Sequence, residues 1–110
     1  MAEGIREISV DQLRSWMEGE PESVFVLDVR ERDEHEVASV EGAVLIPMRE
    51  VQSRLAEIPT DRRVAVMCHH GGRSMAICRA LSAAGRDRLY NVSGGIDQWS
   101  VRVDPSVPRY

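Results

Sequence analysis

Short apolar segments that alternate with helix-like segments are the feature that most constrains the fold of this chain. Residues 23–28 read SVFVLD, residues 43–46 read AVLI and residues 64–67 read VAVM. Strands that are apolar on both faces are typical of a parallel sheet that is covered on both sides. Because parallel strands need crossover connections, the helical segments between them predict an α/β fold with a mainly parallel sheet and helices on both faces.

The other strands and helices are predicted from residue spacing and from stop signals. Residues 5–8 and 89–92 complete a set of five predicted strands. Ser9 and Gln12 have the spacing of a capping box, so a helix is expected to begin there and to end at Gly19. Further helices are predicted over residues 50–58, 73–84 and 94–99, and the charged residues 30–36 are predicted to form a solvated loop or a short helix.

Length and charge exclude several functional classes. A chain of 110 residues predicts one domain, residues 1–110, and a net charge of -4 argues against a nucleic-acid surface. All 14 basic residues are arginine, which excludes lysine chemistry. No segment approaches the roughly 20 apolar residues of a membrane helix, and the N-terminus lacks a cleavage-site pattern. We expect a cytoplasmic monomer that binds neither nucleic acid nor membrane, with Cys68 and Cys78 reduced.

The stretch CHHGGRS, residues 68–74, lies where the fourth predicted strand gives way to a helix. Gly71 and Gly72 can adopt backbone angles that are closed to other residues, and a tight loop of this kind can turn several N–H groups inward. The helix N-terminus adds the positive end of its dipole. Such a setting favours a thiolate and can lower a cysteine pKa to about 3.5–7.5. We interpret Cys68 as a nucleophile or anion-binding group rather than as a small packing residue.

The residues after Cys68 are candidates for substrate binding. Arg73, with one of His69 and His70, is expected to attract an anionic substrate. Zinc binding by Cys68 and the two histidines is not expected, because three consecutive residues cannot easily surround one ion. The candidate substrate-binding residues are His69, His70, Gly71, Gly72, Arg73 and Ser74.

Four stretches of the chain resemble the rhodanese family, in particular its small single-domain sulfurtransferases. The stretches are VFVLDVRE (24–31), EGAVLIPM (41–48), VMCHHGGRS (66–74) and VSGGIDQW (92–99), and together they cover nearly the whole chain. The resemblance implies a twisted, five-stranded, mainly parallel sheet with helices on both sides. It also implies a cysteine, matching Cys68, that carries sulfur as a persulfide.

The length of the cysteine loop separates this family from its chemical neighbours. Four residues lie between Cys68 and Arg73, whereas the cysteine-dependent phosphatases and the arsenate reductases of this fold have five. A shorter loop makes a narrower cup that suits one sulfur atom, and a longer loop can surround a tetrahedral oxyanion. The spacing therefore favours sulfur transfer over phosphatase activity.

Two residues near the second strand gain a role through the resemblance. Asp28 and Arg30 stand where the family has an acid and an arginine near its active loop. This implies that they support the loop through charge-assisted hydrogen bonds. The alternative is a surface ion pair that contributes little.

Other reactive or bulky residues are predicted to be structural. Cys78 is expected to be a small buried side chain, with a resolving thiol as the alternative. His35 is expected at the surface, and Trp99 is expected to pack the last helix against the rest of the protein. Gly94 and Gly95 indicate a tight entry into that helix.

The combined prediction is a thiosulfate sulfurtransferase without a metal or organic cofactor. Sulfur from thiosulfate or a similar donor would pass to cyanide or a thiol through a Cys68 persulfide. The competing hypothesis is a carrier or regulatory binding module that receives sulfur from, or delivers it to, a partner protein.

Overall fold

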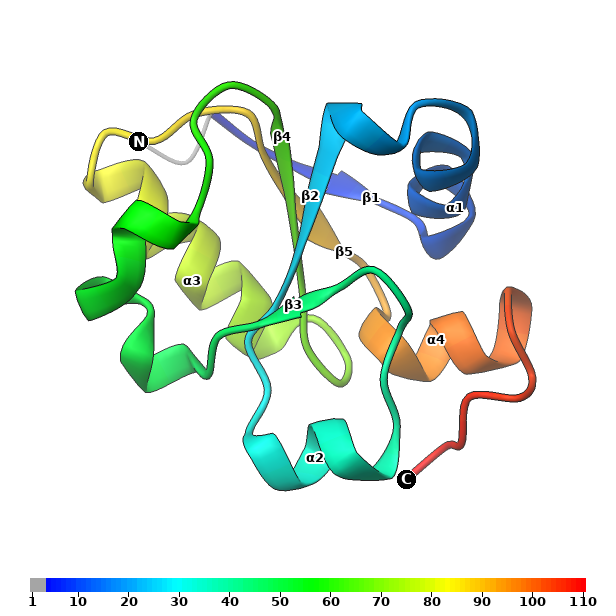
Figure 1. Ribbon diagram of the computed structural model, residues 1–110. Helices are drawn as coiled ribbons and strands as arrows, with labels where there is room; N and C mark the ends of the chain where they lie inside the picture. The colour runs from blue at the N-terminus through cyan, green and yellow to red at the C-terminus, as the bar shows by residue number, and fades with distance from the viewer. Residues whose placement is uncertain (1–3) are drawn as a thin grey trace.

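A parallel five-stranded sheet forms the centre of the molecule, as predicted (Figure 1). The computed structural model describes residues 4–110, so the first three residues of the predicted domain lie outside it. Strands are ordered β1-β5-β4-β2-β3, and each neighbouring pair is parallel. The strands are β1 (Ile5–Ile8), β2 (Val24–Asp28), β3 (Val44–Leu45), β4 (Arg63–Met67) and β5 (Leu89–Val92).

The helices follow the predicted order, with one difference in type. Ser9 caps α1, and its Oγ accepts a hydrogen bond from the N–H of Gln12 at 3.1 Å. Within residues 4–110, no helix has the length and apolar character needed to cross a membrane. The helices are α1 (Val10–Gly19), α2 (Arg32–Val37), α3 (Gly72–Ala83) and α4 (Gly95–Arg102), with 3₁₀ helices η2 (Pro21–Ser23), η3 (Met48–Glu50) and η4 (Gln52–Glu57).

The prediction of a single helix over residues 50–58 was wrong. The segment forms η3 and η4 instead, and Arg54 has non-helical angles of φ -122° and ψ 26°. Pro47 and Pro59 bound the segment, and the kink at Arg54 divides it into short 3₁₀ turns. Val51 and Ile58 still reach the core.

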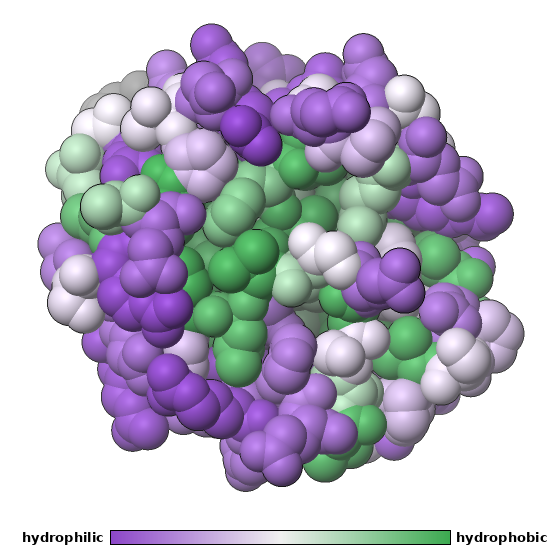
Figure 2. Space-filling model, in the orientation of Figure 1, coloured by the Kyte–Doolittle hydropathy of each residue, from purple (hydrophilic) through white to green (hydrophobic). Residues whose placement is uncertain are grey.

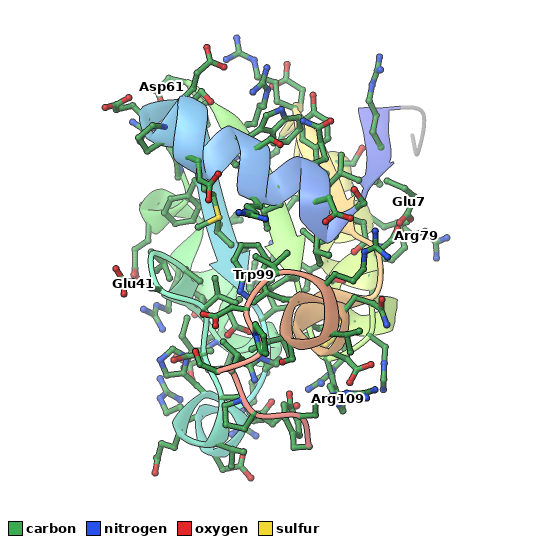
Figure 3. The ribbon with its side chains drawn as sticks, turned by 90° about the vertical axis from the view of Figure 1, so that its right-hand side faces the viewer. Glu7, Glu41, Asp61, Arg79, Trp99 and Arg109 are labelled. Carbon is green, nitrogen blue, oxygen red and sulfur yellow. The ribbon has the colours of Figure 1, made fainter. Side chains whose placement is uncertain are left out.

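Helices cover both faces of the sheet and divide the core in two. On one face, α1 and α4 pack against the strands, as the side view in Figure 3 shows. On the other face, α3 and the segment that contains η4 cover the sheet. The first cluster includes Leu13, Val26, Ala65, Met67, Val92 and Trp99, and the second includes Leu27, Ile58, Val66, Ile77, Cys78, Leu81 and Leu89.

The carboxyl ends of the parallel strands meet at one edge of the sheet, where α2 and the loop before α3 also lie (Figure 1). Asp28 is the last residue of β2, and Cys68 directly follows β4. In parallel α/β sheets, this edge is where ligands bind. The topology therefore places the cysteine at the edge suited to a site.

Arg30 is completely buried, so the prediction that it belongs to a solvated stretch was wrong. Its Nε and Nη2 donate to both carboxylate oxygens of Asp28, at 2.9 and 2.6 Å. The remaining N–H groups donate to the carbonyl oxygens of Ala38 and Glu34 and to the hydroxyl of Tyr110. All five guanidinium donors therefore have partners, which is the condition under which a buried charge is tolerated.

Replacing Asp28 by Ala is predicted to reduce the free energy of unfolding by about 3–5 kcal/mol, because it leaves the buried guanidinium of Arg30 without its counter-charge. Urea unfolding followed by circular dichroism measures this. Arg32→Ala is the matched control, since the ion pair of Arg32 with Glu50 is exposed, and it should cost far less. Equal losses in the two variants would contradict the account.

Candidate functional site

The loop between β4 and α3 directs backbone N–H groups at the sulfur of Cys68. The N–H groups of Gly71 and Ser74 donate to Cys68 Sγ, at 3.1 and 3.4 Å. Ser74 Oγ also lies 3.4 Å from the sulfur. Gly71 has φ +132°, a conformation that L side chains rarely adopt, which explains the glycine at this turn.

The environment of Cys68 stabilises its anion. Burial, with only 2% of the residue exposed, opposes ionisation. The hydrogen bond with the Ser74 side chain, together with those from the N–H groups of Ser74, Gly71 and His70, outweighs it and lowers the pKa of the Cys68 thiol. A thiolate is the reactive form of cysteine, so this loop favours nucleophilic chemistry.

The first turn of α4 forms hydrogen bonds with the backbone of the cysteine loop. The N–H groups of Ile96 and Asp97 donate to the carbonyl oxygens of Cys68 and His69, at 2.9 and 3.1 Å. A Cβ atom on Gly95 would overlap both of these carbonyls. The two glycines therefore allow the tight start of α4 that the sequence predicts, and Gly95 also lets the helix approach the backbone of the cysteine loop closely.

Arg73 carries its charge beside the loop, but that charge is balanced. Its two terminal nitrogens donate to both carboxylate oxygens of Glu34, at 2.7 and 2.9 Å. Hydrogen bonding to Arg73 lowers the pKa of Glu34 to about 2 despite partial burial. The sequence predicts that Arg73 attracts an anion but does not identify Glu34 as its partner, because nothing in a run of charged residues distinguishes one carboxylate from the others.

The two histidines differ in their surroundings. The imidazole of His69 is stacked between the rings of His70 and Tyr110, with centroid distances of 4.1 and 4.0 Å. Burial, and then the neighbouring charge of His70, lower the pKa of His69, which favours the neutral ring. His70 is exposed. Tyr110 could not be predicted from the sequence, since no local pattern connects it with a loop some forty residues earlier.

Asp28 and Arg30 lie behind the loop and support it indirectly. Arg30 binds the backbone of Glu34 and the hydroxyl of Tyr110, and the carboxylate of Glu34 binds Arg73. The expectation of a supporting position therefore has a physical route through α2. His35, expected at the surface, is only partly exposed, and its Nδ1 lies 3.7 Å from Asp28 Oδ2.

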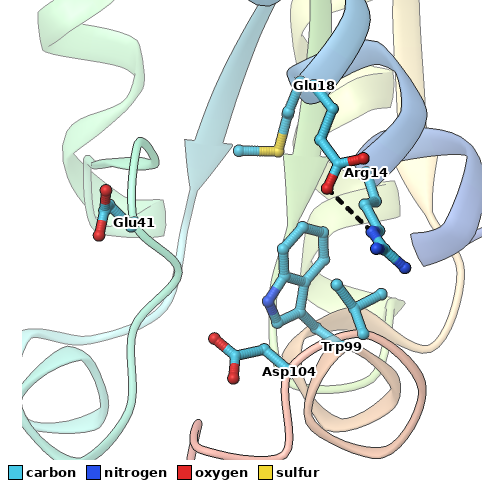
Figure 4. Close-up of a pocket in the computed structure, with 7 residues that line it drawn as sticks. Arg14, Glu18, Glu41, Trp99 and Asp104 are labelled. Atoms are coloured by element: carbon cyan, nitrogen blue, oxygen red, sulfur yellow. Dashed lines mark hydrogen bonds and ion pairs between the residues drawn. The ribbon is translucent and has the colours of Figure 1, made fainter.

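The remaining candidates lie outside the cysteine loop. Cys78 is fully buried, and burial raises its pKa to about 12, which fits the predicted packing role. Among the described residues, no cluster of His, Cys, Asp and Glu could hold a metal ion. Trp99 is buried in the core, as predicted, and also lines a hollow of about 410 Å³ with Met17, Glu41 and Asp104, away from Cys68 (Figure 4).

A second hollow lies beside α3. On the face drawn in Figure 2, apolar side chains gather near the centre and polar ones surround them. A hollow of about 470 Å³ between η3 and α3 has Met48, Val51, Ile77 and Ala80 in its wall. Its lining is mainly apolar, and it does not include Cys68.

The sequence profile of the Rhodanese-like domain family matches residues 9–102. A protein named "Sulfurtransferase" from Allochromatium vinosum is 32% identical over 87% of this chain and 89% of its own length. The "Putative sulfur carrier protein YrkF" of Bacillus subtilis is 33% identical over 94% of this chain. The chain spans 55% of the length of the YrkF protein. It spans 38% of the length of the "Rhodanese-like/PpiC domain-containing protein 12, chloroplastic" of Arabidopsis thaliana, to which it is 35% identical.

Solved structures agree with these matches. The crystal structure of a rhodanese-related protein from Thermoplasma volcanium superposes with a TM-score of 0.81 and is 31% identical. The superposition covers 96% of this chain and 99% of that one.

Alkylation by iodoacetamide is predicted to modify Cys68 and to spare Cys78 in the folded protein. The lowered pKa of Cys68 gives it a larger fraction of thiolate than an ordinary cysteine, and the rate should fall as the pH drops through that lowered pKa. The thiol of Cys78 stays protonated until about pH 12. Peptide mass spectrometry at a series of pH values measures both rates, and equal rates at pH 7 would contradict the account.

Proposed function

Because this chain belongs to the Rhodanese-like domain family, we propose that it is a thiosulfate sulfurtransferase that works through a persulfide on Cys68. The family and the relatives support sulfur transfer as the general chemistry. The observation that carries the specific proposal is the pair of N–H groups, from Gly71 and Ser74, that donate to Cys68 Sγ.

The first step forms the persulfide. The Cys68 thiolate attacks the outer sulfur of thiosulfate, a new S–S bond forms, and the old S–S bond breaks. Its electron pair leaves with sulfite. The persulfide anion that remains stays within reach of the loop amides, which hold negative charge without needing to reorganise.

The second step returns the free enzyme. A thiol or cyanide attacks the outer sulfur of the persulfide, and the electron pair of the broken S–S bond restores the Cys68 thiolate. Each half of the exchange needs only one negatively charged sulfur to be stabilised by the loop, which is Sγ in the free thiolate and the outer sulfur in the persulfide. Division into two half-reactions predicts ping-pong kinetics.

A second candidate function is that of a carrier that receives sulfur from a protein persulfide. Pairing of Arg73 with Glu34 favours it, because thiosulfate is a dianion and the guanidinium nearest the loop is already neutralised. The similarity to a protein named as a sulfur carrier also supports it. Loading by a protein persulfide donor, with no loading by thiosulfate, would favour the carrier over the enzyme.

Cys68→Ser is predicted to abolish sulfur transfer from thiosulfate to cyanide, because a hydroxyl cannot form the persulfide. Intact-mass spectrometry of the natural protein after thiosulfate treatment should show the gain of one sulfur atom, located on Cys68. Cys78→Ser is the control and should retain both the activity and the added sulfur. Full activity in the Cys68 variant would refute the proposal.

Glu34→Gln is predicted to raise kcat/KM for thiosulfate by about tenfold at low ionic strength, since it leaves the charge of Arg73 uncompensated beside the loop. The gain should shrink as salt is added. Glu57→Gln, which removes an exposed carboxylate from an ion pair of η4, serves as the control. An unchanged kcat/KM would show that Arg73 does not contact the donor.

A further inference from the structure

Asn91 is a buried polar side chain in the middle of the sheet. It lies on β5 between β1 and β4, and only 3% of the residue is exposed. On the same face of the strand, Leu89 belongs to the apolar cluster under α3. An amide in such surroundings is costly unless its hydrogen bonds are satisfied.

The hydrogen bonds of Asn91 point to the cysteine loop. Its Nδ2 donates to the carbonyl oxygen of Gly71 at 3.2 Å and to the carboxylate of Glu7 at 3.2 Å. Its Oδ1 accepts from the hydroxyl of Ser74 at 2.5 Å. Because a carbonyl and a carboxylate only accept, Nδ2 must face them, and the orientation of the amide is fixed.

Gly71 and Ser74 are the same two residues whose N–H groups donate to Cys68 Sγ. We propose that Asn91 is a positioning residue that holds both of these residues so that their N–H groups converge on the sulfur. It does not touch the sulfur itself. The importance of Asn91 for sulfur transfer rests on the function proposed above.

One side chain can impose this geometry because of the conformation of the loop. Gly71 has φ +132°, and a glycine has many accessible conformations unless something selects one. Its carbonyl is held by Asn91 and by the N–H of Met75 in the first turn of α3. Fixing that carbonyl limits the orientations in which the Gly71 N–H can lie.

Ser74 contributes a second point of attachment. Its hydroxyl donates to Asn91, and the thiol of Cys68 donates to the same hydroxyl oxygen. Three side chains are thereby linked in a row from β5 to the sulfur. Loss of Asn91 removes one hydrogen bond from Gly71 and one from Ser74.

Other charged groups around the loop are fixed by their own contacts. Arg73 on α3 pairs with Glu34 on α2, and Glu7 on β1 also accepts from the hydroxyl of Ser93. Asp28 and Arg30 form a buried pair after β2. The other titratable groups near the loop are His69, His70, Cys78, Asp97 and Tyr110. An Asn91 variant leaves these contacts in place and, among the charged groups, loses only the contact between Asn91 and Glu7.

The experiment measures the rate of Cys68 alkylation by iodoacetamide from pH 4 to pH 10 in the natural protein and in Asn91→Leu. Leucine has a similar size and leaves the Gly71 carbonyl bonded to Met75, so the variant is expected to fold. The pKa in the profile should rise by about one unit, which is a tenfold loss of rate at a fixed lower pH. Above the new pKa, the rates of the two proteins should agree.

Leu89→Ala is the matched control, because it weakens the same strand on the same face without touching the loop. It should lower stability and leave the pKa of Cys68 unchanged. An unshifted profile in Asn91→Leu, or an equal shift in Leu89→Ala, would overturn the proposal. If the leucine variant does not fold, Asn91→Ala is judged by the same criterion.

Alkylation needs no sulfur donor, so the outcome is separate from the proposed function. A protein that shows the shifted profile but never acquires sulfur from thiosulfate would retain the positioning role and lose the enzymatic one. A protein that forms the persulfide from thiosulfate but shows an unshifted profile would retain the enzymatic role and lose the positioning role of Asn91.

Discussion

Convergence of two backbone N–H groups on one sulfur atom is the interaction on which the site depends. Gly71 and Ser74 supply these groups, and several distant parts of the chain keep them in place. The first turn of α4 fixes the carbonyl of Cys68 itself, while Asn91 fixes the residues that donate. Since peptide dipoles that are already oriented need no rearrangement when charge develops, the fold itself stabilises the anion.

Charges around the loop are arranged in neutral pairs rather than as an open cationic surface. Arg73 is paired with Glu34, and Arg30 with Asp28. The thiolate is therefore stabilised mainly by short-range hydrogen bonds, which salt screens little, rather than by free positive charge. Such a site suits the anion of a Cys68 thiolate or persulfide, and the guanidinium of Arg73 is already paired when a donor arrives. The four-residue spacing between Cys68 and Arg73 points in the same direction.

Features that depend on neighbouring residues could be predicted from the sequence, and features that depend on distant residues could not. Apolar runs predicted the five strands, and Gly71 and Gly72 predicted the tight turn after Cys68. No local pattern shows that Arg73 meets Glu34, that Tyr110 stacks on His69 or that Asn91 reaches Gly71. Arg30 was misread because its charged neighbours suggested solvent. Its side chain turns inward instead, where it pairs with the nearby Asp28 and meets the distant Tyr110.

The most direct test of this account follows the amide protons of the loop by NMR. In ¹⁵N-labelled protein, the signals of Gly71 and Ser74 should move to lower field together as Cys68 ionises. Their common midpoint should lie below the ordinary thiol pKa of about 8.5. Signals that do not titrate, or that titrate at the ordinary value, would show that these N–H groups do not hold the sulfur anion.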